Sequence, residues 1–255
     1  MMPVATRNAD GSWPLMETPS AKKDVSTHPA HHIANEMSFA HNAMIRGLNA
    51  LYLQSPHIPP STHLASDFLF FAASWSAWVL HHHILEETQM FPGFESVPGV
   101  PEGFLQGNVE QHHAFSAGLE EFNEWVRTTG RDAYDGIELR RLIDKFADPL
   151  YEHLNAEIPT LWALDCVSAT HSAQLLQVYK DCEKEAAKQD PFVVPPMVMG
   201  LCDATFQGGN DWPRMPFGAA WVIYWVLGWR HRGAWRFLPS DGYRRPRALA
   251  FLGKK

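Results

Sequence analysis

Two short stretches, Trp78–Glu87 (WVLHHHILEE) and Tyr151–Ile158 (YEHLNAEI), decide the fold of this chain. Each contains a histidine followed four residues later by a glutamate: His82 and Glu86 in the first, His153 and Glu157 in the second. Residues four apart lie on one face of an α-helix. A single pair of this kind is usually a solvated surface pair, but both stretches are flanked by apolar residues. They therefore predict two helices whose polar pairs face the interior of the molecule.

The two pairs belong to a longer repeat in the sequence. Both the histidines and the glutamates of the two pairs are separated by 71 residues, and the same step from His41 reaches His112. This spacing selects one histidine from the triplet 81–83 and one from the pair 112–113. With 14 histidines in the chain, part of the agreement could be coincidence. The repeat nevertheless predicts one set of six metal ligands: His41, His82, Glu86, His112, His153 and Glu157.

Imidazoles and carboxylates inside an apolar bundle are costly unless a positive charge compensates them. Four imidazole nitrogens and two carboxylates suit a pair of Fe, Mn or Zn ions. Each glutamate could bridge both ions while two histidines bind each one. Each ion would then be short of six ligands, with room for water, a bridging oxide or a diatomic molecule. Iron in such a site could change oxidation state and bind O2 or NO, whereas zinc would be inert to both.

Hydrophobic periodicity and proline positions predict the helices that carry these residues. We expect helices over about 29–54, 61–90, 102–129 and 136–164, the last kinked by Pro149, and a fifth over about 168–189. No strand pattern of useful length is present. The expected fold is an all-α, up-down four-helix bundle with a helical or irregular C-terminal extension. Its expected parts are a flexible N-terminal arm over 1–27, the bundle over 28–165 and the extension over 166–255.

Composition limits the classes of partner and the compartment. The formal net charge of -7 leaves no basic surface for nucleic acid. The three scattered cysteines form no C-x-x-C motif, which is typical of a reducing compartment, so we expect a cytoplasmic protein. The N-terminus lacks the apolar core of a signal peptide. The longest apolar run without charge or histidine, 216–229, has 14 residues, too few for a transmembrane segment.

Together the motifs resemble those of the hemerythrin-like HHE cation-binding domain family, whose members are di-iron four-helix bundles. The resemblance rests on four motifs: His41-Asn42, His82-His83-Ile84-Leu85-Glu86-Glu87 followed by Phe91-Pro92, Glu110-Gln111-His112, and His153-Leu154-Asn155-Ala156-Glu157. In family members the ligand glutamate precedes the proline of the Phe-Pro pair by six residues, which again selects Glu86. The resemblance covers about 29–165. The rest is similar to the C-terminal extensions of fungal hemerythrin-like proteins.

The resemblance implies a non-heme di-iron centre that binds O2, peroxide or NO and reacts with it, as an oxidoreductase does, with a small organic substrate possible. Oxygen-carrying hemerythrins use a fifth histidine and a bridging aspartate, for which this sequence offers no obvious place. A four-His, two-Glu set is closer to the iron–sulfur-repair and oxidase-like members. The alternatives are a non-catalytic iron store, O2 carrier or redox sensor, and a metal-stabilised scaffold that binds a partner through its Trp-rich C-terminus. A cavity that is larger than a diatomic molecule and reaches the metals would favour an enzyme.

Several neighbouring residues have expected places outside the ligand set. His81, His83 and His113 should point off the ligand face and support the site or lie at the surface. Glu87 could replace Glu86 if the helix were rotated. Apolar side chains expected near the site are Phe71, Trp75 and Trp78. The tract 225–235 is expected to pack against the bundle rather than touch a membrane surface.

Overall fold

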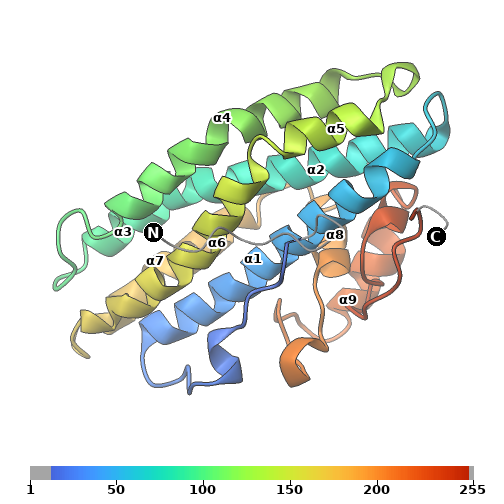
Figure 1. The fold of residues 1–255 in the computed structure, drawn as a ribbon. Helices are drawn as coiled ribbons and strands as arrows, with labels where there is room; N and C mark the ends of the chain where they lie inside the picture. The colour runs from blue at the N-terminus through green and yellow to red at the C-terminus, as the bar shows by residue number, and fades with distance from the viewer. Residues whose placement is uncertain (1–12, 253–255) are drawn as a thin grey trace.

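The computed structural model describes residues 13–252, which are helical and contain no β-strand. Four long antiparallel rods form an up-down bundle (Figure 1). The rods are α1 (Pro29–Gln54), α2 (His63–Leu85), α4 (Gln106–Thr128) and the consecutive pair α5 (Gly136–Ile143) and α6 (Ala147–Trp162). Helix α1 packs on α6, α6 on α4, and α4 on α2. The all-α bundle predicted from the sequence is confirmed.

The first two helices begin and end at the signals present in the sequence. Pro29 occupies the first position of α1, and the His28 imidazole before it accepts a hydrogen bond from the Ala30 amide. A 3₁₀ turn containing Pro56 ends α1, because proline lacks the amide that would continue the helix. The Thr62 hydroxyl then caps α2 by accepting from the Ala65 amide.

Two of the expected helices, those over about 61–90 and 136–164, are interrupted. The first interruption contains a predicted metal ligand, and the second precedes one. Helix α2 is followed by a π-helical turn, Glu86–Met90, and then by α3 (Phe91–Glu95). The Phe91 amide donates to the Glu86 carbonyl five residues earlier, so the turn is wider than an α-turn. The fourth rod breaks at 144–146, where the ring of Pro149 would clash with a helical Lys145 carbonyl. The kink expected from Pro149 is thus a full interruption between α5 and α6.

One half of the bundle is filled by aromatic side chains. Trp75 packs against Phe122 and Phe146, and its indole nitrogen donates to the Met44 carbonyl at 3.1 Å. Phe68 meets Phe237 of the C-terminal segment with ring centroids 4.9 Å apart. Trp75 precedes His82 by seven residues, or about 10 Å along the helix. The aromatic layer therefore lies roughly two turns from the polar residues.

The segment before α1 is packed on the bundle from Trp13 onward, whereas residues 1–12 of the expected arm lie outside the described residues. Trp13 and Met16 are buried. The Trp13 indole donates to Asp148 at 2.8 Å, and the Asn42 side chain bonds to both the amide and the carbonyl of Met16. This part of the chain therefore differs from the flexible arm expected over 1–27.

The C-terminal region contains α7 (Ser172–Ala186), α8 (Val194–Leu201) and the short α9 (Ala219–Val222). Helix α7 packs on α1 and α3, while α8 packs on α1 and α2. Leu201 and Phe237 belong to the same hydrophobic core as the bundle. The tract 225–235 packs against the bundle only in part. His231 stacks on Phe70, whereas Trp225 and Trp229 are exposed. Among the described residues, no helix is long and apolar enough to cross a membrane.

Candidate metal centre

All six predicted ligand residues converge in the interior of the bundle. His41 comes from α1, His82 from the last turn of α2, and Glu86 from the start of the π-helical turn. His112 comes from α4, and α6 carries both His153 and Glu157. Five of the six are at most 2% exposed. The exception is His82, whose side chain is 18% exposed.

Each of the two carboxylates lies between two histidines from different helices. Glu86 places Oε1 2.8 Å from His82 Nε2 and Oε2 3.5 Å from His112 Nε2. Glu157 Oε2 lies 3.3 Å from His41 Nε2 and 3.6 Å from His153 Nε2. Each glutamate therefore lies next to the histidine of its own i,i+4 pair and next to a histidine of another helix.

Hydrogen bonds on the outer side of the cluster fix the tautomer of three histidines. His41 Nδ1 donates to the Leu154 carbonyl at 2.8 Å, and His112 Nδ1 donates to the Glu87 carboxylate at 2.7 Å. His153 Nδ1 donates to the side-chain oxygen of Gln111 at 3.3 Å. With the proton on Nδ1, each Nε2 presents a lone pair to the interior, the arrangement typical of metal-binding histidines. Glu87 thus bonds to a ligand candidate from outside and does not replace Glu86.

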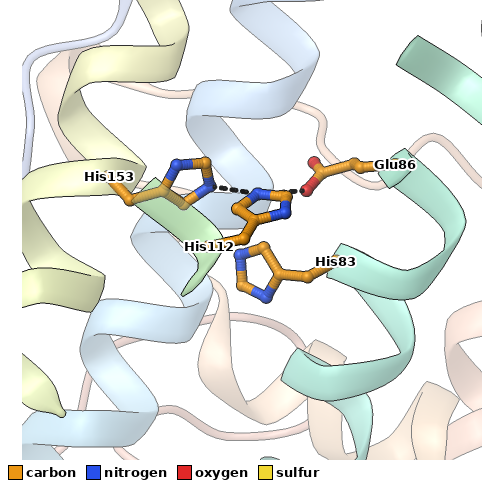
Figure 2. A group of neighbouring side chains, drawn as sticks. All are labelled: His83, Glu86, His112 and His153. Atoms are coloured by element: carbon orange, nitrogen blue, oxygen red, sulfur yellow. Dashed lines mark hydrogen bonds and ion pairs between the residues drawn. The ribbon is translucent and has the colours of Figure 1, made fainter. Parts of the chain in front are cut away.

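The inward-facing atoms lack the partners that buried polar groups require. His41 Nε2, His82 Nε2 and all four oxygens of Glu86 and Glu157 are buried without a hydrogen-bond partner among the described residues. His112 Nε2 and His153 Nε2 lie 3.0 Å apart (Figure 2), with a lone pair on each. Two nitrogen ligands at ~2.1 Å from one ion and at right angles to each other would stand about 3 Å apart. The donor set therefore fits a metal cation.

Burial also sets the protonation states that metal binding needs. Desolvation lowers the pKa of His82 and of His112 to about 4, and it lowers the pKa of His41 and His153 as well. All four imidazoles are therefore neutral near pH 7, which is the ligand form. Desolvation raises the pKa of Glu86 and Glu157, and for Glu157 the facing Glu86 carboxylate adds to the effect. A cation between the two carboxylates would offset both causes.

His83 lies in the cluster rather than off its face, so the predicted position is wrong for this residue. It is 5% exposed, and its ring centroid lies 4.7 Å from that of His112 and 5.1 Å from that of His153 (Figure 2). Consecutive residues on an α-helix point about 100° apart. Because α2 has bundle helices on both sides, His82 and His83 can both point inward. His113, by contrast, is exposed on α4, in agreement with its prediction.

The side chains form two adjoining groups in which potential ligand atoms lie within 4.8 Å of one another. One group contains His83, Glu86, His112 and His153, and the other contains His41, His82 and Glu86. Glu86 belongs to both groups. The buried residues therefore offer two neighbouring metal positions with a shared carboxylate.

A cavity of about 320 Å³ borders the second group. It lies between the bundle and the C-terminal helices, and His82 and Glu86 form part of its wall. The rest of the wall is mainly apolar and includes Met37 and Ala40 of α1, Trp78 and Leu85 of α2, Tyr179 and Cys182 of α7, and Val198 of α8. Of the three aromatic residues expected near the site, Trp78 lines this cavity. Phe71 and Trp75 are buried in the aromatic half of the bundle instead.

Fold and cluster together define a helical-bundle protein with a buried cation site built from facing helices. The family model for the hemerythrin HHE cation-binding domain matches residues 14–159, and the chain belongs to this family. The chain is also similar to the dimeric xanthone biosynthesis cluster protein R11 of Cryptosporiopsis sp. (strain 8999). The two are 34% identical over 245 residues, which cover 95% of this chain and 92% of the relative. No solved structure matches the chain.

Proposed function

We propose that this protein is a non-heme di-iron oxidoreductase that uses O2 or peroxide to oxidise a small organic molecule. The observation that carries the proposal is the cavity of about 320 Å³ whose wall includes His82 and Glu86. Small-molecule sites commonly have volumes of about 300–1,000 Å³. A diatomic gas needs no space of this size, so the cavity favours an organic substrate over simple carriage.

The proposed ligands are the six residues selected from the sequence. Glu86 and Glu157 would each bridge both irons, since each lies between histidines of the two groups. His41 and His82 would bind one iron, and His112 and His153 the other. Iron held there supplies a redox couple that can exchange electrons with O2, peroxide or NO. Manganese could replace it, whereas zinc could fill the site without supporting redox chemistry.

The cavity wall indicates the kind of substrate. Trp78, Met37 and Val198 provide an apolar surface, and Tyr179 and Glu183 provide polar groups. Burial and the neighbouring Glu183 carboxylate raise the pKa of Tyr179, so its hydroxyl stays protonated and can donate a hydrogen bond. The name of the fungal relative refers to xanthone biosynthesis, and its similarity extends over α7 and α8, which form one side of the cavity. We therefore propose a polycyclic aromatic substrate that carries hydroxyl or carbonyl oxygens.

The test starts from metal-free protein loaded anaerobically with Fe(II) and analysed for iron content and Mössbauer spectrum. O2 is then added with and without a hydroxylated anthraquinone or xanthone. The expected result is two irons per chain, O2 uptake accelerated by the aromatic compound, and an oxidised product detected by mass spectrometry. Full recovery of O2 under vacuum over several cycles, with the ferrous spectrum restored, would instead identify a carrier. Binding of iron without any reaction would leave a store or a redox sensor.

We further propose that the protein works in the cytoplasm. Cys166, Cys182 and Cys202 are all free thiols in the structure, as expected in a reducing compartment. Ferrous iron for the site is also kept reduced there. Fractionation of cells that express a tagged full-length chain, with organelle markers, tests this location, and enrichment in an organelle fraction would contradict it.

A further inference from the structure

Three tryptophans form an exposed aromatic stripe on the C-terminal region. The helical segment made of α9 and the π-helical turn after it packs on α8, at the edge of the molecule (Figure 1). Trp221 and Trp225 lie on this segment, and Trp229 continues the same spacing of four residues in the turn that follows. All three are more than half exposed, and so is Val226 between them. An exposed apolar patch of this kind marks an interaction site.

Arginines accompany the aromatic stripe. Residues 212–252 contain seven arginines and one acidic residue, although the whole chain has a net charge of -7. The Arg232 guanidinium lies 4.2 Å from the ring centroid of Trp229, and that of Arg230 lies 5.4 Å from the ring of Phe192. A guanidinium that rests on an aromatic face can still donate hydrogen bonds from its edge. The stripe and its arginines therefore form a surface that is both apolar and positively charged.

We propose that this surface docks the protein on a membrane of anionic lipids. Tryptophan is enriched at membrane interfaces because its amphipathic ring fits the level of the headgroups, and arginine donates paired hydrogen bonds to phosphate. The helical segment 219–227 is too short to cross a bilayer, so it would lie in the plane of the interface. A second copy of the chain fits less well, since a symmetric dimer would bring the arginines of both copies together.

A cavity of about 270 Å³ beside the aromatic stripe provides room for a lipid headgroup. Two tryptophans of the stripe line it, together with Arg232 and Arg247. Arg247 donates to the Leu238 carbonyl at 3.0 Å and to the Trp235 carbonyl at 2.7 Å, which fixes its guanidinium in the wall. The Asp241 carboxylate in the same wall accepts hydrogen bonds from two backbone amides. A lipid phosphate in this cavity would therefore meet two guanidinium groups.

Helix α8 separates this cavity from the one beside the metal centre. Val198 lines the cavity at the metal centre, and its neighbour Met199 lines the other. An α-helix with its side chains is about 10 Å across. Docking would thus hold the proposed substrate cavity close to lipid, in which a polycyclic aromatic compound dissolves. This consequence rests on the proposed function, whereas the docking itself does not.

Sedimentation with vesicles tests the docking on the full-length protein. The vesicles contain phosphatidylcholine alone or with about 30% phosphatidylserine, and we expect about tenfold tighter binding to the anionic ones. Salt at about 0.5 M should release most of the bound protein, because it screens the arginines. Equal binding to both kinds of vesicle, or binding to neither, would overturn the proposal.

Variants assign the binding to the surface. The double changes Trp221→Ala with Trp225→Ala, and Arg232→Glu with Arg245→Glu, should each weaken binding to anionic vesicles about tenfold. The matched controls, listed by type, are an apolar and a charge change at exposed positions of α5 and α4, Ile137→Ala and Arg127→Glu, which should bind as the wild type does. Equal losses in the controls would place the contact elsewhere and overturn the proposal.

Sedimentation velocity covers the other occupants. A wild-type dimer that the tryptophan variant converts to a monomer would assign the surface to a second copy, and a monomer that binds no vesicle would leave another protein. Should a variant not fold, quenching of the wild-type tryptophans by lipids brominated near the headgroup still decides the matter. In fractionated cells, a salt wash releases protein docked on the cytoplasmic face of an organelle but not protein inside it. None of these measurements depends on iron, so failure of the proposed oxidation is seen separately.

Discussion

Two neighbouring residues on one helix, His82 and His83, belong to opposite halves of the cluster. The half around His83, His112 and His153 is covered by Phe91 and Phe115. The half around His41 and His82 borders a cavity built by the C-terminal helices. The bundle therefore supplies a closed set of donors, while the extension shapes the access to them. Ligand number and substrate access are thus set by different parts of the chain.

The carboxylates that join the two halves should show the largest effect. Glu86→Ala or Glu157→Ala removes a negative charge that lies between two metal positions, so the one remaining carboxylate cannot neutralise the cations. We expect metal content to fall below two per chain, as measured by mass spectrometry of the loaded and desalted protein. His113→Ala, the exposed control, should retain two. Full occupancy in both glutamate variants would show that neither carboxylate bridges.

The rate at which a cysteine in the cavity wall is alkylated tests whether bulk solvent reaches the cavity. Cys182 lines the cavity, and burial raises its pKa from the usual 9 to about 11. A higher pKa means less thiolate, which is the reactive form, so at pH 8 alkylation should be about a hundredfold slower than for an ordinary thiol. Exposed Cys166 is the internal reference. Peptide mapping after a timed exposure to iodoacetamide gives both rates, and similar rates would mean that the cavity is open to bulk water.

Features of the cluster that follow from local sequence could be predicted, whereas features that depend on contacts between helices could not. The His-x-x-x-Glu spacing and the 71-residue repeat identified six residues that the structure brings together. The four-residue spacing reflects local helix geometry, and the repeat relates the helix pair α1 and α2 to the pair α4 and α6. Pro149 likewise marked the interruption of the fourth rod. The inward position of His83 could not be derived, since it depends on how far α4 and α6 surround α2. The run of three histidines, His81–His83, was a sequence signal that His83 could be buried.

Neither the cavity nor the hydrogen bond from His112 to Glu87 could be predicted from the sequence. The cavity depends on how α7 and α8 rest on α1 and α2, and no local pattern encodes that contact. The Glu87 bond depends on how α4, which carries His112, lies against the end of α2, where the π-helical turn Glu86–Met90 begins. In both cases, tertiary packing decides a feature that periodicity leaves open.

Filling the cavity should affect substrate oxidation while leaving both metal positions intact. Ala186 of α7 lines the cavity, and Ala186→Trp would place an indole in the space available to an organic substrate. We expect substrate-dependent O2 uptake to fall about tenfold, equivalent to ~1.4 kcal/mol, with two metals still bound. Ala173→Trp, on the exposed side of the same helix, is the matched control. An unchanged rate in Ala186→Trp would place the substrate elsewhere.

The smallest effect is expected at Glu87, which accepts a hydrogen bond from His112 Nδ1 at the closed half of the cluster, the half that Phe91 and Phe115 cover. A charged acceptor makes His112 Nε2 more basic than a neutral one does, but the Glu87 side chain is 37% exposed, so water weakens the effect. Glu87→Gln keeps an acceptor oxygen and should weaken the binding of one of the two metals about threefold, in a competition with a chelator. Glu110→Gln removes the same charge from an exposed position near His112 on α4 and should change affinity less. Equal losses in the two variants would mean that net charge, rather than the hydrogen bond to His112, sets the affinity of the closed half.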